Sequence, residues 1–184
     1  MTLANKITIT RFLLIPIMVV FMAVPMQGTV IGLPLNHFIA AIIFAVAAFT
    51  DFLDGYIARK YNQITTFGKF LDPIADKVLV ISAMIFLVGT SRIAFWGVVI
   101  VIFREFIITG VRLLAVEKGD VIAASPYGKI KTIATMIAML VMLFGDFTLK
   151  PIYGDIIWYI AILFTVISGL DYIIKNRKII FNNI

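Results

Sequence analysis

Long apolar blocks separated by short polar segments fill the chain. They fall at Arg11–Met26, Phe38–Lys60, Lys69–Gly89, Ile93–Ala115, Gly128–Phe147 and Ile152–Tyr172. Each block is long enough, or nearly so, for the ~20 residues that a helix needs to cross a bilayer. The apolar residues do not alternate with the period of a strand, so helices are expected. The pattern therefore predicts an all-α integral membrane protein with six transmembrane helices.

The composition supports a bilayer as the natural solvent. Of the 184 residues, 62% are hydrophobic and 14% are charged, whereas soluble domains are roughly half apolar and a quarter charged. No segment is long or polar enough for a second domain, so residues 1–184 are expected to form one membrane domain. No small-residue cleavage site follows the first block, which is therefore interpreted as a retained span. The chain has no cysteine, which excludes disulfides, thiolate metal sites and a cysteine nucleophile.

The basic residues predict the orientation of the chain, because cytoplasmic flanks carry an excess of Lys and Arg. Only Arg92 and Lys150 fall on the opposite side from the main basic set, which is Lys6, Arg11, Arg59, Lys60, Lys69, Lys77, Arg112, Lys118, Lys129, Lys131, Lys175, Arg177 and Lys178. We therefore expect a multi-pass protein of the cytoplasmic membrane, with both termini and the active site facing the cytoplasm. Its net charge of +6 favours anionic lipid and anionic cytosolic substrates, and no nucleic-acid partner is expected.

Four acidic residues, Asp51, Asp54, Asp72 and Asp76, crowd the predicted cytoplasmic ends of the second and third spans. A charged side chain at membrane depth costs roughly 2.5–3.5 kcal/mol, so such residues usually face a protein interior and indicate a functional site. The members of each pair are three or four residues apart and project from one helix face. The alternative is a set of solvated helix ends or structural ion pairs.

Four carboxylates in one pocket would repel one another unless cations neutralise them. Hard divalent ions, Mg²⁺ or Mn²⁺, are the expected partners of oxygen ligands, and the cluster can hold two of them. Two metals suit displacement at phosphorus, where the attacking and leaving oxygens both need stabilisation. Arg59 adds a bidentate donor suited to phosphate, while Gly55, Ala58 and Gly68 leave room for a ligand to approach the backbone.

The spacing Asp51-x-x-Asp54-Gly55-x-x-Ala58-Arg59, eight residues, Gly68-x-x-x-Asp72-x-x-x-Asp76 resembles the complete signature of the CDP-alcohol phosphotransferase family. At about one residue in twenty per position, such a match arises by chance on the order of once in 10¹⁰ windows. The resemblance covers essentially the whole chain, including the six-helix architecture.

The resemblance implies a role for each matched residue. Asp51, Asp54, Asp72 and Asp76 would bind the metals, and Asp76 would also be the general base toward the acceptor hydroxyl. The donor CDP-diacylglycerol would bind at Asp54, Gly55, Ala58, Arg59, Gly68 and Asp72. The resemblance also implies a homodimer packed through membrane helices.

The acceptor alcohol has to be inferred from other residues. Basic groups inside or at the ends of neighbouring helices suit an acceptor that carries a phosphate, because unpaired buried cations are costly. We hypothesise that glycerol 3-phosphate is held through its phosphate by four basic residues, Arg104, Arg112, Lys129 and Lys131. The alternatives are positive-inside topology and headgroup contact for the last three, and a structural pair with Glu105 or another carboxylate for Arg104.

Three further polar residues, Asn5, Thr8 and Arg11, recur at intervals of three and would form one helical face near the metals or the nucleotide. They could instead be the helix start and interfacial anchors of the first span. Asn5-x-x-Thr8-x-x-Arg11, Arg104-Glu105-Phe106 and Gly128-Lys-x-Lys-Thr resemble the branch of the family that uses glycerol 3-phosphate. We assign Asn5 and Thr8 to the CDP-diacylglycerol site.

Two other functions fit parts of the pattern. The same donor chemistry could use inositol phosphate, serine or another acceptor, against which only the basic residues argue. A divalent-cation transporter would also place carboxylates inside a membrane. Against that second alternative, the acids gather at one membrane face, Arg59 lies among them, and no second half suggests an inverted repeat.

Overall fold

The structure is a computed structural model that describes residues 3–60, 66–117, 122, 125–145, 151–177 and 180. Within those ranges it describes all side chains except those of residues 3, 4, 52–60, 66, 67 and 69. The described part contains six α-helices: α1 (Leu3–Ala23), α2 (Leu35–Lys60), α3 (Thr66–Gly89), α4 (Phe95–Glu117), α5 (Pro126–Leu143) and α6 (Ile152–Lys175). Two short strands, β1 (Thr29–Val30) and β2 (Leu33–Pro34), form an antiparallel hairpin. The expected all-α architecture is confirmed.

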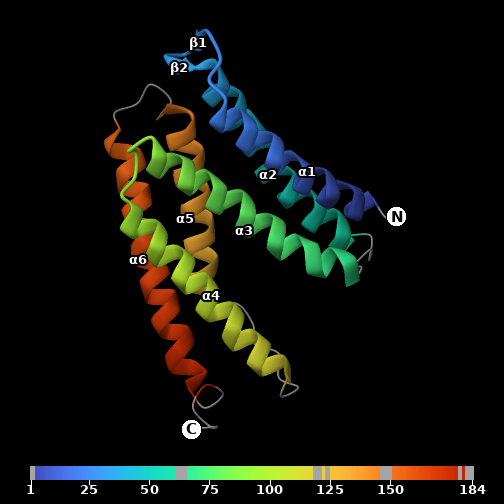
Figure 1. Cartoon of the computed structure of the whole chain (residues 1–184). Helices are drawn as coiled ribbons and strands as arrows, with labels where there is room; N and C mark the ends of the chain where they lie inside the picture. Colours follow the sequence, from blue (N-terminus) through green and yellow to red (C-terminus); the bar gives the residue numbers. More distant parts are fainter. Residues whose placement is uncertain are drawn as a thin grey trace. The chain divides into compact units, whose positions relative to one another are not determined.

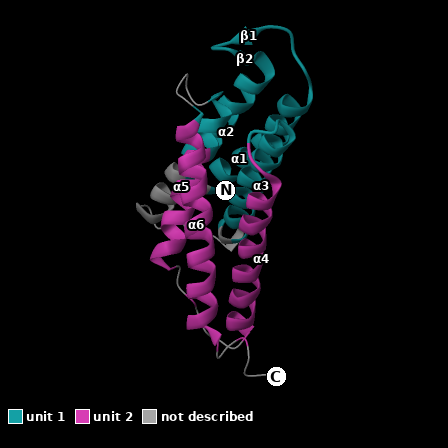
Figure 2. Ribbon diagram, turned by 90° about the vertical axis from the view of Figure 1, so that its left-hand side faces the viewer, with its two compact units in different colours: residues 1–92, 139–151 teal, residues 93–138, 152–184 magenta. Residues whose placement is uncertain are grey.

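The chain divides into two compact units, coloured separately in Figure 2. Unit 1 comprises Met1–Arg92 and Met139–Pro151, and unit 2 comprises Ile93–Ala138 and Ile152–Ile184. Helix α5 therefore contributes residues to both units.

In unit 1, helix α1 packs along α2 and α3 (Figure 1). Small residues on α2, Ala40, Ala41 and Ala47, are completely buried, as is Met18 of α1. Side chains without branches or bulk let helix backbones approach closely, which is how helices commonly associate in membranes. The apolar core thus joins the first three helices and fixes the polar side chains that they carry.

The hairpin between α1 and α2 is an element that the apolar pattern did not predict. Its turn residues Ile31 and Gly32 both have positive φ, 53° and 77°. Two consecutive positive φ angles give the tight turn whose twist matches paired strands, a conformation that Gly adopts easily and a β-branched residue rarely. The two-residue strands are too short to show an alternating pattern, so the spacing of apolar residues cannot predict them.

In unit 2, helix α4 packs against α6 (Figure 2). Gly97 of α4 lies so close to α6 that an added Cβ would meet Ile162 Cδ1 at 2.8 Å and Trp158 Cζ2 at 3.0 Å. The contact therefore depends on a glycine at this position, and it anchors one end of the helix pair.

Many large apolar side chains lie on the outside of the helices, including Leu13, Val20, Val99, Phe103 and Leu163. Exposed apolar surface on this scale indicates contact with lipid. Among the described residues, three helices are long and apolar enough to cross a membrane: α1 from Asn5, α5 and α6. Helices α3 and α4 have the length, but both carry charged residues in their interiors.

The helices differ from the expected spans mainly at their ends. Helix α1 begins at Leu3 instead of Arg11, because its polar first turns pack within the protein and hydropathy marks only the lipid-facing part. Helix α5 ends at Leu143 instead of continuing to Phe147. Gly145, with a φ of 63°, ends the helical geometry there, as glycine often does just beyond a helix.

Candidate functional site

Arg11 of α1 joins two of the predicted metal ligands in unit 1. Its side chain is fully buried, and its Nη1 donates to Asp51 Oδ1 at 2.7 Å and to Asp76 Oδ1 at 3.1 Å. Asp51 lies on α2 and Asp76 on α3, so a single guanidinium brings carboxylate oxygens from two helices together. Both carboxylates keep part of their surface exposed, 34% for Asp51 and 42% for Asp76.

A second α1 residue holds the third described carboxylate. The Thr8 hydroxyl donates to Asp72 Oδ1 at 2.8 Å, and Thr8 is buried, as is Asn5 one turn earlier. The polar face predicted for the first span therefore packs toward the aspartates of the following helices. In this position Thr8 orients a carboxylate, and the alternative of an interfacial anchor does not describe its contacts.

The carboxylates held by Arg11 and Thr8 are chemically suited to a divalent metal. Asp51, Asp72 and Asp76 are oxygen ligands of the kind that Mg²⁺ and Mn²⁺ prefer, and their combined negative charge exceeds the charge of the Arg11 guanidinium. No described group of three or more His, Cys, Asp or Glu side chains is assembled closely enough to hold a metal. The side chain of Asp54, the fourth predicted ligand, lies outside the described residues. The residues present thus fit a cation chemically.

Most residues predicted to bind CDP-diacylglycerol lie at the end of α2 and the start of α3. Gly55, Ala58 and Arg59 lie on the last turns of α2, where the structure describes the backbone as helical but not the side chains. Gly68 lies in the first turn of α3 and is buried. The backbone therefore places the first half of the signature at the end of α2 and the second half at the start of α3.

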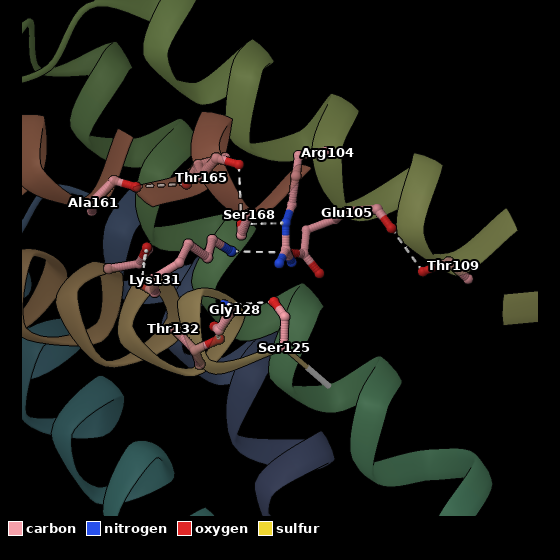
Figure 3. Close-up of polar contacts among 11 residues, drawn as sticks. Arg104, Glu105, Thr109, Ser125, Gly128, Lys131, Thr132, Ala161, Thr165 and Ser168 are labelled. Carbon is pink, nitrogen blue, oxygen red and sulfur yellow. Dashed lines mark hydrogen bonds and ion pairs between the residues drawn. The ribbon is translucent and has the colours of Figure 1, made fainter. Parts of the chain in front are cut away.

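In unit 2, two of the four predicted acceptor residues meet at one carboxylate (Figure 3). Arg104 Nη1 and Lys131 Nζ both donate to Glu105 Oε1, at 2.7 and 2.9 Å. The side chains are 13%, 7% and 19% exposed for Arg104, Lys131 and Glu105. With two cations and one anion, these three side chains by themselves carry one net positive charge.

Helix α6 supplies a further residue of this cluster, Ser168. Arg104 Nε donates to the hydroxyl of Ser168 on α6 at 3.2 Å, and Ser168 itself donates to the Thr165 carbonyl (Figure 3). Helices α4, α5 and α6 thus each supply a polar residue. The structural pair of Arg104 with Glu105, considered from the sequence as an alternative, is present; it is compatible with anion binding because the charges do not cancel.

The other two predicted acceptor residues, Arg112 and Lys129, are exposed. Among the described residues, no hydrogen bond or ion pair joins either side chain to the Arg104 cluster. Arg112 lies two turns beyond Arg104 on α4, and Lys129 precedes Lys131 by two positions and so projects from a different face of α5. The geometry therefore supports a shared site for Arg104 and Lys131 alone.

The sequence offered no signal for Ser168. A single serine in an apolar span is ordinary, and its role depends on the neighbour that reaches it from α4. Glu105 was visible only as a possible partner of Arg104, because its bond to Lys131 joins residues 26 positions apart.

The profile of the family described as CDP-alcohol phosphatidyltransferase matches residues 1–167. The chain belongs to this family. The resemblance inferred from the aspartate signature is therefore confirmed, and with its apolar helices the chain is a membrane protein of the CDP-alcohol phosphatidyltransferase family.

Relatives within the family match over nearly their full lengths. A Bacillus subtilis protein is 42% identical over 182 residues, covering 95% of this chain and 94% of its own. Proteins from Rickettsia bellii and Haemophilus influenzae are 39% and 38% identical, with at least 95% of each chain covered. All three are named CDP-diacylglycerol–glycerol-3-phosphate 3-phosphatidyltransferase.

Proposed function

We propose that this protein transfers the phosphatidyl group from CDP-diacylglycerol to glycerol 3-phosphate, giving phosphatidylglycerol phosphate and CMP in phospholipid biosynthesis. The observation that carries the proposal is the full-length similarity to the relatives named for this reaction, at 38–42% identity. The complete aspartate signature and the basic cluster around Arg104 support the donor and acceptor halves separately.

Two divalent ions, Mg²⁺ or Mn²⁺, would be held by Asp51, Asp54, Asp72 and Asp76, and would stabilise negative charge on the phosphate oxygens. The protein's own contribution is to hold the carboxylates before substrate arrives. Arg11 fixes Asp51 and Asp76, and Thr8 fixes Asp72. Preorganised groups do not have to be reoriented during the reaction, which is a large part of electrostatic catalysis.

Asp76 is the proposed general base. Its side chain is 42% exposed, so an acceptor hydroxyl can reach it, and a positioned carboxylate can take the hydroxyl proton as the oxygen attacks phosphorus. The new bond joins the acceptor oxygen to the phosphatidyl phosphorus. The bond from that phosphorus to CMP breaks, and CMP leaves with the electron pair.

The acceptor phosphate is assigned to the positively charged cluster of Arg104 and Lys131. A hydrogen bond from a guanidinium to a phosphate oxygen joins oppositely charged partners and is stronger than one between neutral groups. Arg112 and Lys129 are exposed, and their positive charges would attract an anionic acceptor electrostatically over a longer distance. Asn5, Gly55, Ala58, Arg59 and Gly68 remain assigned to the CDP-diacylglycerol site.

The chain is proposed to be a single catalytic domain that crosses the cytoplasmic membrane six times and forms a homodimer through its membrane helices. Both termini and the aspartates would face the cytoplasm. The basic residues support this orientation, because the ends expected to be cytoplasmic carry most of the Lys and Arg.

The test is CMP release by the purified protein in detergent, supplied with CDP-diacylglycerol and Mg²⁺ or Mn²⁺. Glycerol 3-phosphate, serine, inositol and inositol phosphate are compared as acceptors. We expect glycerol 3-phosphate alone to drive release, and Asp76→Asn to reduce kcat by about 10²–10⁴-fold, the usual contribution of a general base.

Asp171→Asn is the matched control, because Asp171 pairs with Lys175 on α6, away from the aspartate signature in the sequence. Its activity should match that of the unmodified protein. Release only with another alcohol would refute the acceptor, and the absence of release with every acceptor would refute the enzymatic proposal and favour the cation transporter.

A further inference from the structure

Arg104 is held in one orientation by contacts along its whole side chain. Ser168 accepts from Nε at 3.2 Å, and Glu105 accepts from Nη1 at 2.7 Å. Two glycines adjoin it: an added Cβ would lie 3.3 Å from Arg104 Cγ at Gly169 and 3.0 Å from Nη2 at Gly128. Side chains larger than glycine at positions 128 and 169 would therefore reduce the space that the Arg104 side chain occupies.

One end of this guanidinium remains available. Within the part of the chain that the structure describes, Nη2 forms no hydrogen bond or ion pair, while Nε and Nη1 each have a partner. Because the guanidinium is planar and its donors have a fixed geometry, holding Nε and Nη1 also fixes where the Nη2 protons point. Those protons lie beside Gly128, at the start of α5.

Ser168 can act toward Arg104 only as an acceptor. Its hydroxyl proton is already donated to the Thr165 carbonyl at 3.1 Å, so its lone pairs face the guanidinium. A fully buried hydroxyl fixed in this way gives one direction for the Nε bond and selects a single rotamer of the long Arg104 side chain.

We propose that Ser168 and Gly128 are positioning residues for the acceptor phosphate, and that both act through Arg104. Ser168 orients Arg104 so that Nη2 can meet the phosphate, and the missing side chain of Gly128 leaves room for Nη2 in that position. Glu105 keeps Lys131 within reach of the same anion while leaving one net positive charge. This inference rests on the proposed transfer to glycerol 3-phosphate and names two residues that the aspartate signature does not include.

The experiment measures KM for each substrate in the CMP-release assay. Ser168→Ala should raise KM for glycerol 3-phosphate roughly tenfold, the size expected for one hydrogen bond to a charged group, and leave KM for CDP-diacylglycerol within about twofold. Gly128→Ala should also raise KM for glycerol 3-phosphate, because its Cβ would lie 3.0 Å from Nη2 and displace the guanidinium.

Thr165→Val is the matched control. Thr165 is also fully buried on α6, but its hydroxyl donates to the Ala161 carbonyl of its own helix. A purely structural effect of losing a buried hydroxyl would appear in both variants, whereas an effect through Arg104 appears only in Ser168→Ala.

A double-mutant cycle separates positioning from packing. In an Arg104→Lys background, Ser168→Ala should raise KM for glycerol 3-phosphate no further, because the Nε that it orients is gone. The inference is overturned if Ser168→Ala and Gly128→Ala both match Thr165→Val, or if the effects of Arg104→Lys and Ser168→Ala simply add. If the unmodified protein does not use glycerol 3-phosphate at all, the proposed function fails instead.

Discussion

The Arg11 contacts predict a stability change that depends on metal. Arg11→Met keeps a long buried side chain and removes the guanidinium that Asp51 and Asp76 share at 2.7 and 3.1 Å. Removing one partner of a fully buried ion pair costs about 3–5 kcal/mol. Because the two carboxylates are 34% and 42% exposed, water compensates part of this loss, and we expect a cost of about 2 kcal/mol.

For a chain of this length, 1 kcal/mol corresponds to a change in Tm of roughly 2–4 °C. Arg11→Met should therefore lower Tm by about 4–8 °C in detergent with a chelator present. With saturating Mn²⁺ the loss should be less than half as large, because a divalent cation replaces the missing positive charge and its binding stabilises the folded state. The measurement is thermal unfolding of the unmodified and variant proteins under both conditions.

Lys6→Met is the control, since it removes the same charge from an exposed position on α1. Its Tm should change by less than about 2 °C with or without metal. Equal losses for Arg11→Met and Lys6→Met would contradict the buried bridge. A loss for Arg11→Met that Mn²⁺ does not reduce would contradict the assignment of Asp51 and Asp76 to a cation site.

Two further outcomes follow from the helices. Gly97→Ala should lower Tm by about 3 °C, because overpacking against Trp158 costs about 2 kcal/mol and better helix propensity returns about 1 kcal/mol. Gly110→Ala is the control on the same helix: nothing lies within 4 Å of its added Cβ, so it should raise Tm slightly. Equal effects of the two substitutions on Tm would contradict the close contact at Gly97. Because the chain has no cysteine, the single variants Met26→Cys and Lys175→Cys can report its orientation in the membrane. A membrane-impermeant thiol reagent added to intact cells should label Met26→Cys and not Lys175→Cys. The reverse labelling pattern would refute the proposed orientation.

The local pattern of the sequence was sufficient for the class of fold and for the aspartate signature. Lipid solvates the outside of the helices, so apolar blocks must recur at the length of a bilayer span, and this can be read without tertiary information. The spacing of Asp51, Asp54, Asp72 and Asp76 is equally local, since each pair lies within about one turn of a helix. That spacing led directly to the family that the comparison confirmed.

Only the tertiary structure decided which polar side chains meet. Thr8 reaches Asp72 across 64 positions, and Lys131 reaches Glu105 across 26. Such contacts depend on how helices rotate and cross, which many weak packing contacts set together, and no single motif records them. The same reason explains why Arg112 and Lys129 looked equivalent to Lys131 in the sequence. Positive charge near a helix end is local, but burial beside a shared carboxylate is a property of the packed helices.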